Sequence, residues 1–279
     1  MAIDYEREYN VHGLVPEHPQ IAGRREVEAR AYRAQARGAE FSVSYGPSPR
    51  QIYDFFPAPG AAKPPLAMYI HGGGWRALSP SMFSHMAKGA NGNGVSVAVA
   101  GYDLCPEASI AIIIEEMRAA ALFLWRRHRR RIFVYGHSAG AHLAACLIAT
   151  DWKTLAPDAP ADLLPAGYLV SGVYDLGPLV HTTANEILRL DEKTARAVSP
   201  LFWRVPPGRK VEFVVGGDES SEFTRQSRTI AETWRQAGAD TRFAEIAGNH
   251  FTAIDPLADP QSAMSRRVAE MAREVAVLG

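Results

Sequence analysis

A serine between two glycines separates an apolar strand-like run from an apolar helix-like run, and this junction constrains the fold more than any other segment. The pentapeptide Gly136–Gly140 reads GHSAG; it directly follows RIFVY at Arg131–Tyr135 and directly precedes AHLAACLIAT. Flanking glycines permit a sharp turn from a strand into a helix, which projects the Ser138 hydroxyl at the C-terminal edge of a sheet. A glycine-rich turn without chemistry is the alternative, and the strand and helix on its two sides argue against it.

From residue 66 onward, apolar runs alternate with helical patterns, which predicts a mostly parallel sheet with helices on both faces. Two earlier β-like runs, Phe41–Tyr45 and Gln51–Phe56, flank the turn-rich GPSPR and predict an antiparallel hairpin at the sheet edge, for eight strands in all. The other expected strands are Leu66–Ile70, Val95–Ala100, Arg131–Tyr135, Gly167–Ser171, Lys210–Val215 and Thr241–Ile246. The expected helices among them are Pro80–Ala90, Ile110–His128, Ala139–Thr150, Ala184–Leu190, Ser221–Ala237 and Gln261–Val277.

A chain of 279 residues, 47% of them hydrophobic, can bury one large core, so we expect residues 1–279 to form a single domain. The stretch His18–Arg37 is rich in Ala, Arg and Glu and lies between Pro19 and Gly38, which predicts a helix. We expect the segment 1–38 to act as a helical lid over a pocket. The segments 151–165 and 181–206 are expected to be crossovers or cap insertions.

The charge balance narrows the class of partner. Thirty basic residues offset thirty acidic ones, so no field of one sign would attract nucleic acid or an anionic membrane. The N-terminal stretch is charged and no apolar run is long enough to cross a bilayer. We therefore expect a cytoplasmic protein with a small-molecule substrate and leave a homodimer open. Cys105 and Cys146 have no CxxC spacing and are expected to be buried side chains, with no metal and no cofactor involved.

Three consecutive glycines follow the first expected parallel strand, in the segment HGGGW at His71–Trp75. Glycines leave backbone N–H groups unshielded, and such donors stabilise the oxyanion of a tetrahedral intermediate. We assign the N–H groups of Gly73 and Gly74 to an oxyanion hole that the N–H of Ala139 completes. A turn needed only for packing is the alternative.

The general base is expected after the last strand, where EIAGNHF places His250. Only His250 fits the order nucleophile, acid, histidine; packing or hydrogen bonding suffices to explain His71, His137 and His142. An orienting carboxylate is expected after the preceding strand. The segment VEFVVGGDESSEF offers three candidates that spacing alone does not separate, namely Asp218, Glu219 and Glu222.

Taken together, HGGGW, the segment YDLCPE, GHSAGAHLA and the region DESSEFTRQS to NHF resemble the kynurenine formamidase (arylformamidase) branch of the esterase/lipase α/β hydrolases. The resemblance covers most of the chain. It implies an α/β-hydrolase fold, with the small cap contributed by the N-terminal helix and the insertions. It also implies Glu219 as the first choice for the triad acid, with Asp218 second. Because Gly74 stands where this branch often has an aromatic residue, HGGGW also resembles the hormone-sensitive-lipase type of esterase.

The expected activity is a serine hydrolase that cleaves a small acyl ester or an aryl formamide such as N-formylkynurenine through an acyl-enzyme. A broad carboxylesterase or carbamate hydrolase is the close alternative, and a ligand-binding module without chemistry is a third hypothesis. Position alone suggests Trp75 and Phe251 as walls of the substrate pocket. Weaker candidates for the same pocket are Trp152, Phe202 and Trp203.

Overall fold

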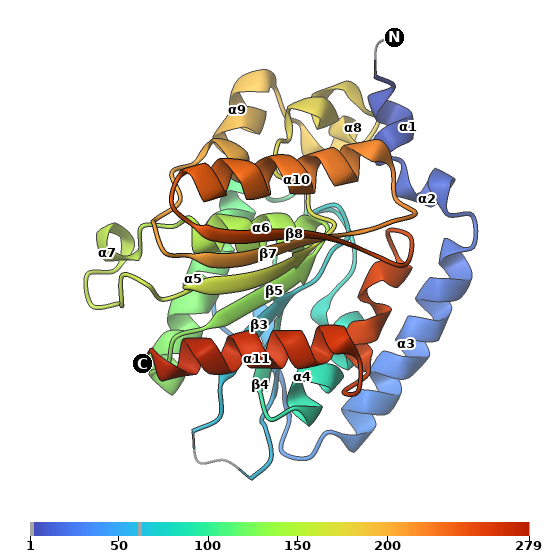
Figure 1. Ribbon diagram of the computed structural model, residues 1–279. Helices are drawn as coiled ribbons and strands as arrows, with labels where there is room; N and C mark the ends of the chain where they lie inside the picture. The colour runs from blue at the N-terminus through green and yellow to red at the C-terminus, as the bar shows by residue number, and fades with distance from the viewer. Residues whose placement is uncertain (1–2, 61–62, 279) are drawn as a thin grey trace.

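An eight-stranded sheet runs through the residues that the computed structural model describes, 3–60 and 63–278 (Figure 1). Its strands lie in the order β1-β2-β4-β3-β5-β6-β7-β8. β2 pairs antiparallel with β1 and with β4, and all other neighbours are parallel. The expected mostly parallel sheet with an antiparallel hairpin at one edge is confirmed. The strands are β1 Glu40–Ser44, β2 Ile52–Phe56, β3 Leu66–Ile70, β4 Ser96–Ala100, β5 Phe133–His137, β6 Ala166–Val170, β7 Lys210–Gly216 and β8 Asp240–Ile246.

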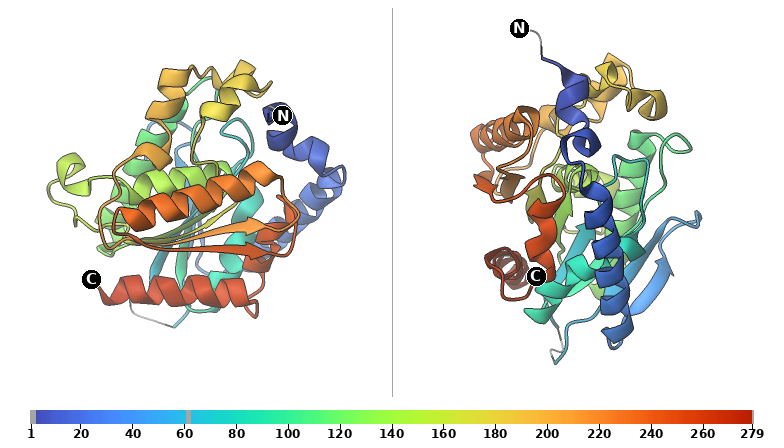
Figure 2. Two further views of the ribbon diagram at one scale, coloured as in Figure 1. Left: turned by 45° about the horizontal axis from the view of Figure 1, so that its top comes forward. Right: turned by 90° about the vertical axis from the view of Figure 1, so that its right-hand side faces the viewer.

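Helices cover both faces of the sheet, as expected (Figures 1 and 2). α5, α6 and α10 pack on one face, and the 3₁₀ helix η1, α4 and α11 pack on the other. Side chains at the N-termini fix where two of these helices begin: Ser109 accepts a hydrogen bond from the Ile112 N–H, and Ser262 accepts one from the Ser265 N–H. The bounds are η1 Pro80–Ala87, α4 Lys88–Gly92, α5 Ile110–His128, α6 Ala139–Ile148, α10 Ser221–Gln236 and α11 Ala263–Val277.

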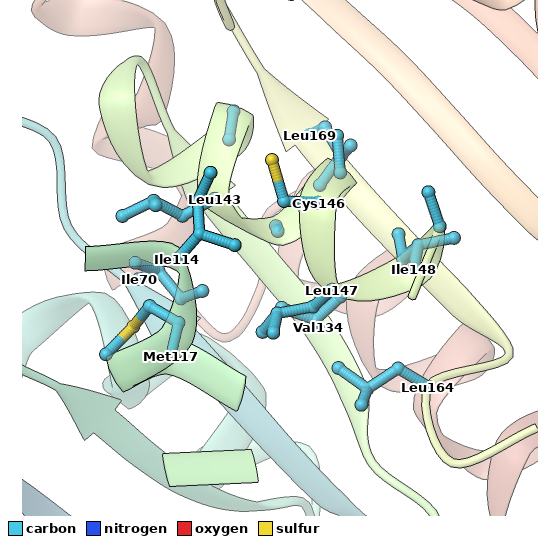
Figure 3. Packing of buried hydrophobic residues seen from close by; sticks show 14 of the residues in the cluster. Ile70, Ile114, Met117, Val134, Leu143, Cys146, Leu147, Ile148, Leu164 and Leu169 are labelled. Atoms are coloured by element: carbon cyan, nitrogen blue, oxygen red, sulfur yellow. The ribbon is translucent and has the colours of Figure 1, made fainter. Parts of the chain in front are cut away.

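α6, the helix that follows Ser138, packs between α5 and the central strands (Figure 3). Every residue of α6 is buried, and so is every residue of β3, β5 and β6. Close approach requires glycine at two positions: a Cβ on Gly140 would lie 2.0 Å from the Ile70 carbonyl oxygen, and one on Gly167 would lie 2.6 Å from the Ile148 Cδ1. This packing holds the start of α6, and with it Ser138, rigidly against the sheet.

Residues 5–14 and the segment 171–206 lie together at one end of the molecule, where they form a small cap (Figure 2). The carboxylate of Glu6 on α1 accepts hydrogen bonds from the Thr183 backbone N–H, at 2.7 Å, and from the Thr183 hydroxyl, at 2.9 Å. α3 continues from this cap along the side of the molecule (Figure 1). The bounds of α3 are His18–Gln35, and the cap elements are α1 Tyr5–Tyr9, α2 Val11–Leu14, η2 Gly177–His181, α8 Asn185–Leu188, α9 Glu192–Ala197 and η3 Pro200–Phe202.

Some expectations about the helices need correction. The helix expected over Pro80–Ala90 is divided into η1 and α4, and the one expected over Ala184–Leu190 is the single turn α8. The segment 151–165, with the short helix α7 Trp152–Leu155, is a crossover only, because the Leu163 carbonyl accepts a hydrogen bond from Ile132 just before β5 begins. That position is the end of β5 opposite Ser138. Among the described residues, no helix combines the length and the hydropathy that crossing a bilayer requires.

Candidate active site

Ser138 lies on the turn between the end of β5 and the start of α6, with a left-handed backbone (φ 55°, ψ −121°). This conformation is rare for a residue other than glycine and is held by the packing around it. The flanking glycines permit the turn, since a Cβ on Gly136 would lie 2.6 Å from the Gly140 carbonyl oxygen. As a result, the Ser138 hydroxyl stands at the carboxyl end of the sheet, where it is only partly buried.

The structure brings Ser138, His250 and Glu219 into one hydrogen-bonded chain. His250 Nε2 lies 3.0 Å from Ser138 Oγ, and His250 Nδ1 lies 2.6 Å from Glu219 Oε2. With the proton on Nδ1, the imidazole donates to the carboxylate and presents Nε2 as an acceptor to the serine hydroxyl. An imidazole oriented in this way can remove the hydroxyl proton when the serine attacks a carbonyl carbon.

Glu219 is the carboxylate that faces His250. Its Oε1 accepts a hydrogen bond from the Gly216 backbone N–H at 2.7 Å and another from the Ser171 hydroxyl, and its side chain is fully buried. Asp218 is exposed and its backbone N–H donates to the Gly248 carbonyl. Of the three carboxylates that spacing left open, the structure therefore places Glu219 in the chain and leaves Asp218 outside it.

Glu222, the third candidate, is committed to a different contact. Arg225 donates two hydrogen bonds to its carboxylate, at 2.6 and 2.7 Å, and the Tyr9 hydroxyl donates a third at 2.9 Å. Burial raises the pKa of Glu222, but these hydrogen bonds outweigh it, so that the pKa lies below its usual range. Glu222 therefore attaches α1 to α10 and does not reach the imidazole.

The loop after β3 presents two free backbone donors beside Ser138. Gly73 and Gly74 both have positive φ, 115° and 59°, a conformation that glycine adopts without strain. Within the described residues, the N–H groups of Gly73 and Gly74 donate no hydrogen bond to the protein. The Ala139 N–H belongs to the first residue of α6 and so has no partner within its helix. The structure thus leaves the three donors expected for an oxyanion hole available to a ligand.

A cavity of about 280 Å³ opens onto Ser138 and His250. Both Trp75 and Phe251 line it, as expected from their positions in the sequence. Its wall also includes residues that sequence reasoning missed, contributed by α1, α2, the segment 171–206 and the first turn of α10, because only tertiary contacts bring these segments to the site. Those residues include Tyr9, Val11, His12, Leu179, Thr183 and Phe223.

A model of the alpha/beta hydrolase fold family matches residues 67–255 of this chain. The chain belongs to this family. The matched residues run from β3, past the glycine loop, Ser138 and Glu219, to the residues just after His250. The hydrolase thus carries its proposed nucleophile, acid and base within the segment that defines the family.

Named relatives and a solved structure agree with this assignment. The hydrolase is 29% identical to a kynurenine formamidase of Danio rerio over 82% of this chain and 80% of that protein. It is 28% identical to a kynurenine formamidase of Drosophila melanogaster over 78% of this chain and 76% of that protein. A solved structure from Silicibacter sp., described as a candidate thioesterase, is 31% identical with a TM-score of 0.85, covering 96% of this chain and 99% of that one. The chain is therefore an enzyme of the serine hydrolase type.

The three weaker pocket candidates of the hydrolase lie elsewhere, and placing them in the pocket was wrong. Trp152 is fully buried in the core and donates to the Leu147 carbonyl. Trp203 donates to the Ala197 carbonyl, and Phe202 packs under Arg196. Their apolar neighbourhoods gave no signal that separates core or surface packing from substrate contact.

Three histidines near the site of the hydrolase have structural contacts, in agreement with their interpretation from sequence. His137 donates a hydrogen bond from Nε2 to the His250 carbonyl oxygen at 2.8 Å. His142 accepts from the Trp75 indole N–H at 3.2 Å and donates to the Val198 carbonyl at 2.7 Å. His71 donates to the Gly72 carbonyl at 2.7 Å and stacks on Tyr102. These neutral imidazoles fix the backbone on which the site is built.

We expect the free energy of unfolding to fall as the pH is lowered from 6.5 toward 4. Burial lowers the pKa of both His71 and His142 from 6.5 to about 4. Between these values the unfolded chain binds more protons than the folded one, so acid favours unfolding by about 3 kcal/mol per histidine. Urea denaturation at stepped pH measures the effect, and the variant His142→Asn should show a smaller slope. A stability that stays constant over this interval would contradict the prediction.

Proposed function

We propose that the hydrolase cleaves the formyl amide bond of aryl formamides of the N-formylkynurenine type, and small acyl esters, through an acyl-enzyme on Ser138. The observation that carries the proposal is the hydrogen-bonded chain Ser138–His250–Glu219, which opens onto a cavity beside the free N–H groups of the glycine loop. The relatives named kynurenine formamidase align over about four fifths of the chain. This similarity supports the formamide as the substrate class.

The first half of the reaction forms the acyl-enzyme. His250 Nε2 takes the hydroxyl proton while Ser138 Oγ attacks the carbonyl carbon, and the N–H groups of Gly73, Gly74 and Ala139 hydrogen-bond the oxyanion. The C–N bond then breaks, and the departing amine takes the proton from His250. Glu219 holds the imidazole in the required tautomer and stabilises its cation.

The second half releases the acid. Water gives a proton to His250 and attacks the acyl carbon, and collapse of the second tetrahedral intermediate returns the proton to Ser138 Oγ. For a formamide substrate the products are formate and a free aryl amine. Apart from this water, the proposed steps use side chains and backbone groups of this chain. The cytoplasmic location and the possible homodimer, both expected from the sequence, remain predictions.

A hydrolase of small esters or thioesters is the second candidate, favoured by the similarity to the Silicibacter structure. Both functions use the same residues, so substrate preference decides between them. We expect kcat/KM for N-formylkynurenine to exceed that for para-nitrophenyl acetate by about ten-fold or more. A panel that adds an aryl carbamate and a short thioester measures the preference. A panel in which esters or thioesters are the better substrates by the same factor would overturn the formamide proposal.

A further inference from the structure

Arg76 directly follows the glycine loop and lines the cavity next to it. Its side chain folds back over the loop: Nε and Cγ lie 3.6 and 3.8 Å from the point that a Cβ on Gly74 would occupy. The backbone N–H of Arg76 donates to the Gly73 carbonyl at 3.1 Å, which fixes the residue on the loop. Arg76 is exposed, and its side chain therefore lies beside Gly74 at the solvent-facing edge of the cavity.

Arg76 has no acidic partner in the part of the chain that the structure describes. Among residues 3–60 and 63–278, its guanidinium forms no ion pair and no side-chain hydrogen bond. Other arginines of the N-terminal half do find carboxylates, such as Arg24 and Arg25 with Asp255, or Arg33 with Asp54. The five N–H donors of Arg76 remain available to a group outside the chain.

The other charged side chains of the cavity wall, Glu6 and Arg25, already have partners within the protein. Glu6 is the acidic residue of the wall, and both of its carboxylate oxygens accept hydrogen bonds from Thr183. Arg25 also lines the cavity, but it is buried, lies 2.9 Å from Asp255, and donates to the Phe251 carbonyl. Arg76 is thus the charge of the wall that lacks a fixed partner among the described residues.

A neutral imidazole and an aromatic ring lie near Arg76 in the cavity wall. His12 on α2 lines the same cavity, and its pKa is lowered by burial and then by the charges of His18, Arg76 and His250. Phe251 offers an aromatic surface beside this group, with ring centres 5.5 Å from His12 and 5.8 Å from His250. A ligand that carries both an aromatic ring and a negative charge would complement this wall.

We propose that Arg76 binds a carboxylate on the leaving group of the substrate and so makes the hydrolase selective for aryl amides and esters whose leaving group bears a carboxylate. The inference rests on the proposed function, because a formyl group is too small to carry the charge and the rest of the substrate leaves. A planar guanidinium can donate two parallel hydrogen bonds to a carboxylate. In N-formylkynurenine the carboxylate and the formyl group lie at opposite ends of the molecule, so a carboxylate bound by Arg76 would leave the scissile carbonyl free to reach the glycine loop.

The test compares two matched substrates that differ only in charge, N-formylkynurenine and its carboxamide. We expect Arg76→Gln to lower kcat/KM for the carboxylate by about ten- to hundred-fold, mainly through KM, because a hydrogen bond between charged groups is lost. The carboxamide should change by less than about two-fold. Arg76→Lys should retain part of the preference, since it keeps the charge but not the planar fork. The matched control is Arg30→Gln, which changes an exposed arginine that pairs with Glu26 on its own helix.

A second pair separates failure of this inference from failure of the formamidase proposal. para-Acetoxybenzoate and para-acetoxybenzamide are esters whose leaving groups differ by the same charge. If formamides are not hydrolysed but Arg76→Gln abolishes the preference for the charged ester, Arg76 keeps its role and the formamide is wrong. If Arg76→Gln lowers kcat/KM equally for charged and neutral substrates, the role of Arg76 is to support the glycine loop. If kcat/KM is unchanged for both pairs, Arg76 does not recognise the substrate. Either result overturns the inference.

Discussion

Replacing Ser138 by alanine is expected to lower kcat by about a million-fold, the size of loss seen when a hydrolase triad loses its nucleophile. The reason is specific to the geometry: Ser138 Oγ is the atom that His250 Nε2 contacts at 3.0 Å, and alanine leaves nothing to form the acyl-enzyme. Turnover of para-nitrophenyl acetate and N-formylkynurenine by purified protein measures the loss. Covalent labelling by a fluorophosphonate probe should disappear in the same variant, and turnover that persists at the rate of the unmodified enzyme would exclude the proposed mechanism.

Stability provides the control for this variant. Serine and alanine bear a similar cost in the left-handed backbone at position 138, so the substitution leaves this strain unchanged. Ser138→Ala should therefore fold with the circular dichroism spectrum of the unmodified chain. Glycine adopts that conformation without strain, so Ser138→Gly should be equally inactive but more stable, by about 1 kcal/mol. Loss of activity in a variant that is at least as stable as the parent separates chemistry from folding.

The sequence predicted the central sheet well because its strands are buried on both faces. Leu66–Ile70 is apolar from end to end, and Lys210–Gly216 is buried beyond its first residue even though it contains Glu212; glycines or helical patterns bound both runs. The strand, the serine turn and the helix at Ser138 form one local unit, so short-range sequence carries the information. Local patterns therefore sufficed wherever neighbours in sequence are neighbours in space.

The cap was harder to predict, because contacts between distant residues form it. α1 is five residues long, and Glu8 attaches it to α10. The Glu8 carboxylate accepts hydrogen bonds from the Ser221 hydroxyl, at 2.8 Å, and from the Glu222 N–H, at 3.0 Å. A helix of this length is not stable alone, so its sequence shows little periodicity. Similarly, η1 has the composition of an α-helix, and only the hydrogen-bond pitch distinguishes it.

The choice of triad acid is a case that spacing along the sequence does not decide. Asp218 and Glu219 are adjacent, and either side chain could reach an imidazole if the loop turned to suit it. The structure selects Glu219 because the Gly216 N–H and the Ser171 hydroxyl hold its Oε1, which aims Oε2 at His250. Ser171 follows β6, 48 residues away in the sequence, so no local pattern could reveal this contact.

Changing Glu219 to glutamine should reduce kcat by about ten-thousand-fold with little loss of fold, the effect known for an amide in place of a triad carboxylate. The glutamine oxygen can still accept from the Gly216 N–H and the Ser171 hydroxyl, which turns the amide NH₂ toward His250 Nδ1. A donor at that position forces the imidazole proton onto Nε2, which then no longer accepts from Ser138. Steady-state kcat and the rate of fluorophosphonate labelling should fall together.

The matched control is Asp218→Asn, one residue away on the same loop. Asp218 is exposed and lies outside the hydrogen-bonded chain, so its variant should keep kcat within about two-fold. Glu219→Asp should fall between the two, because the charge remains but the shorter side chain cannot hold both Gly216 and His250. If instead Asp218→Asn costs far more activity than Glu219→Gln, then the carboxylate that orients His250 during turnover is Asp218, and the loop must rearrange when substrate binds.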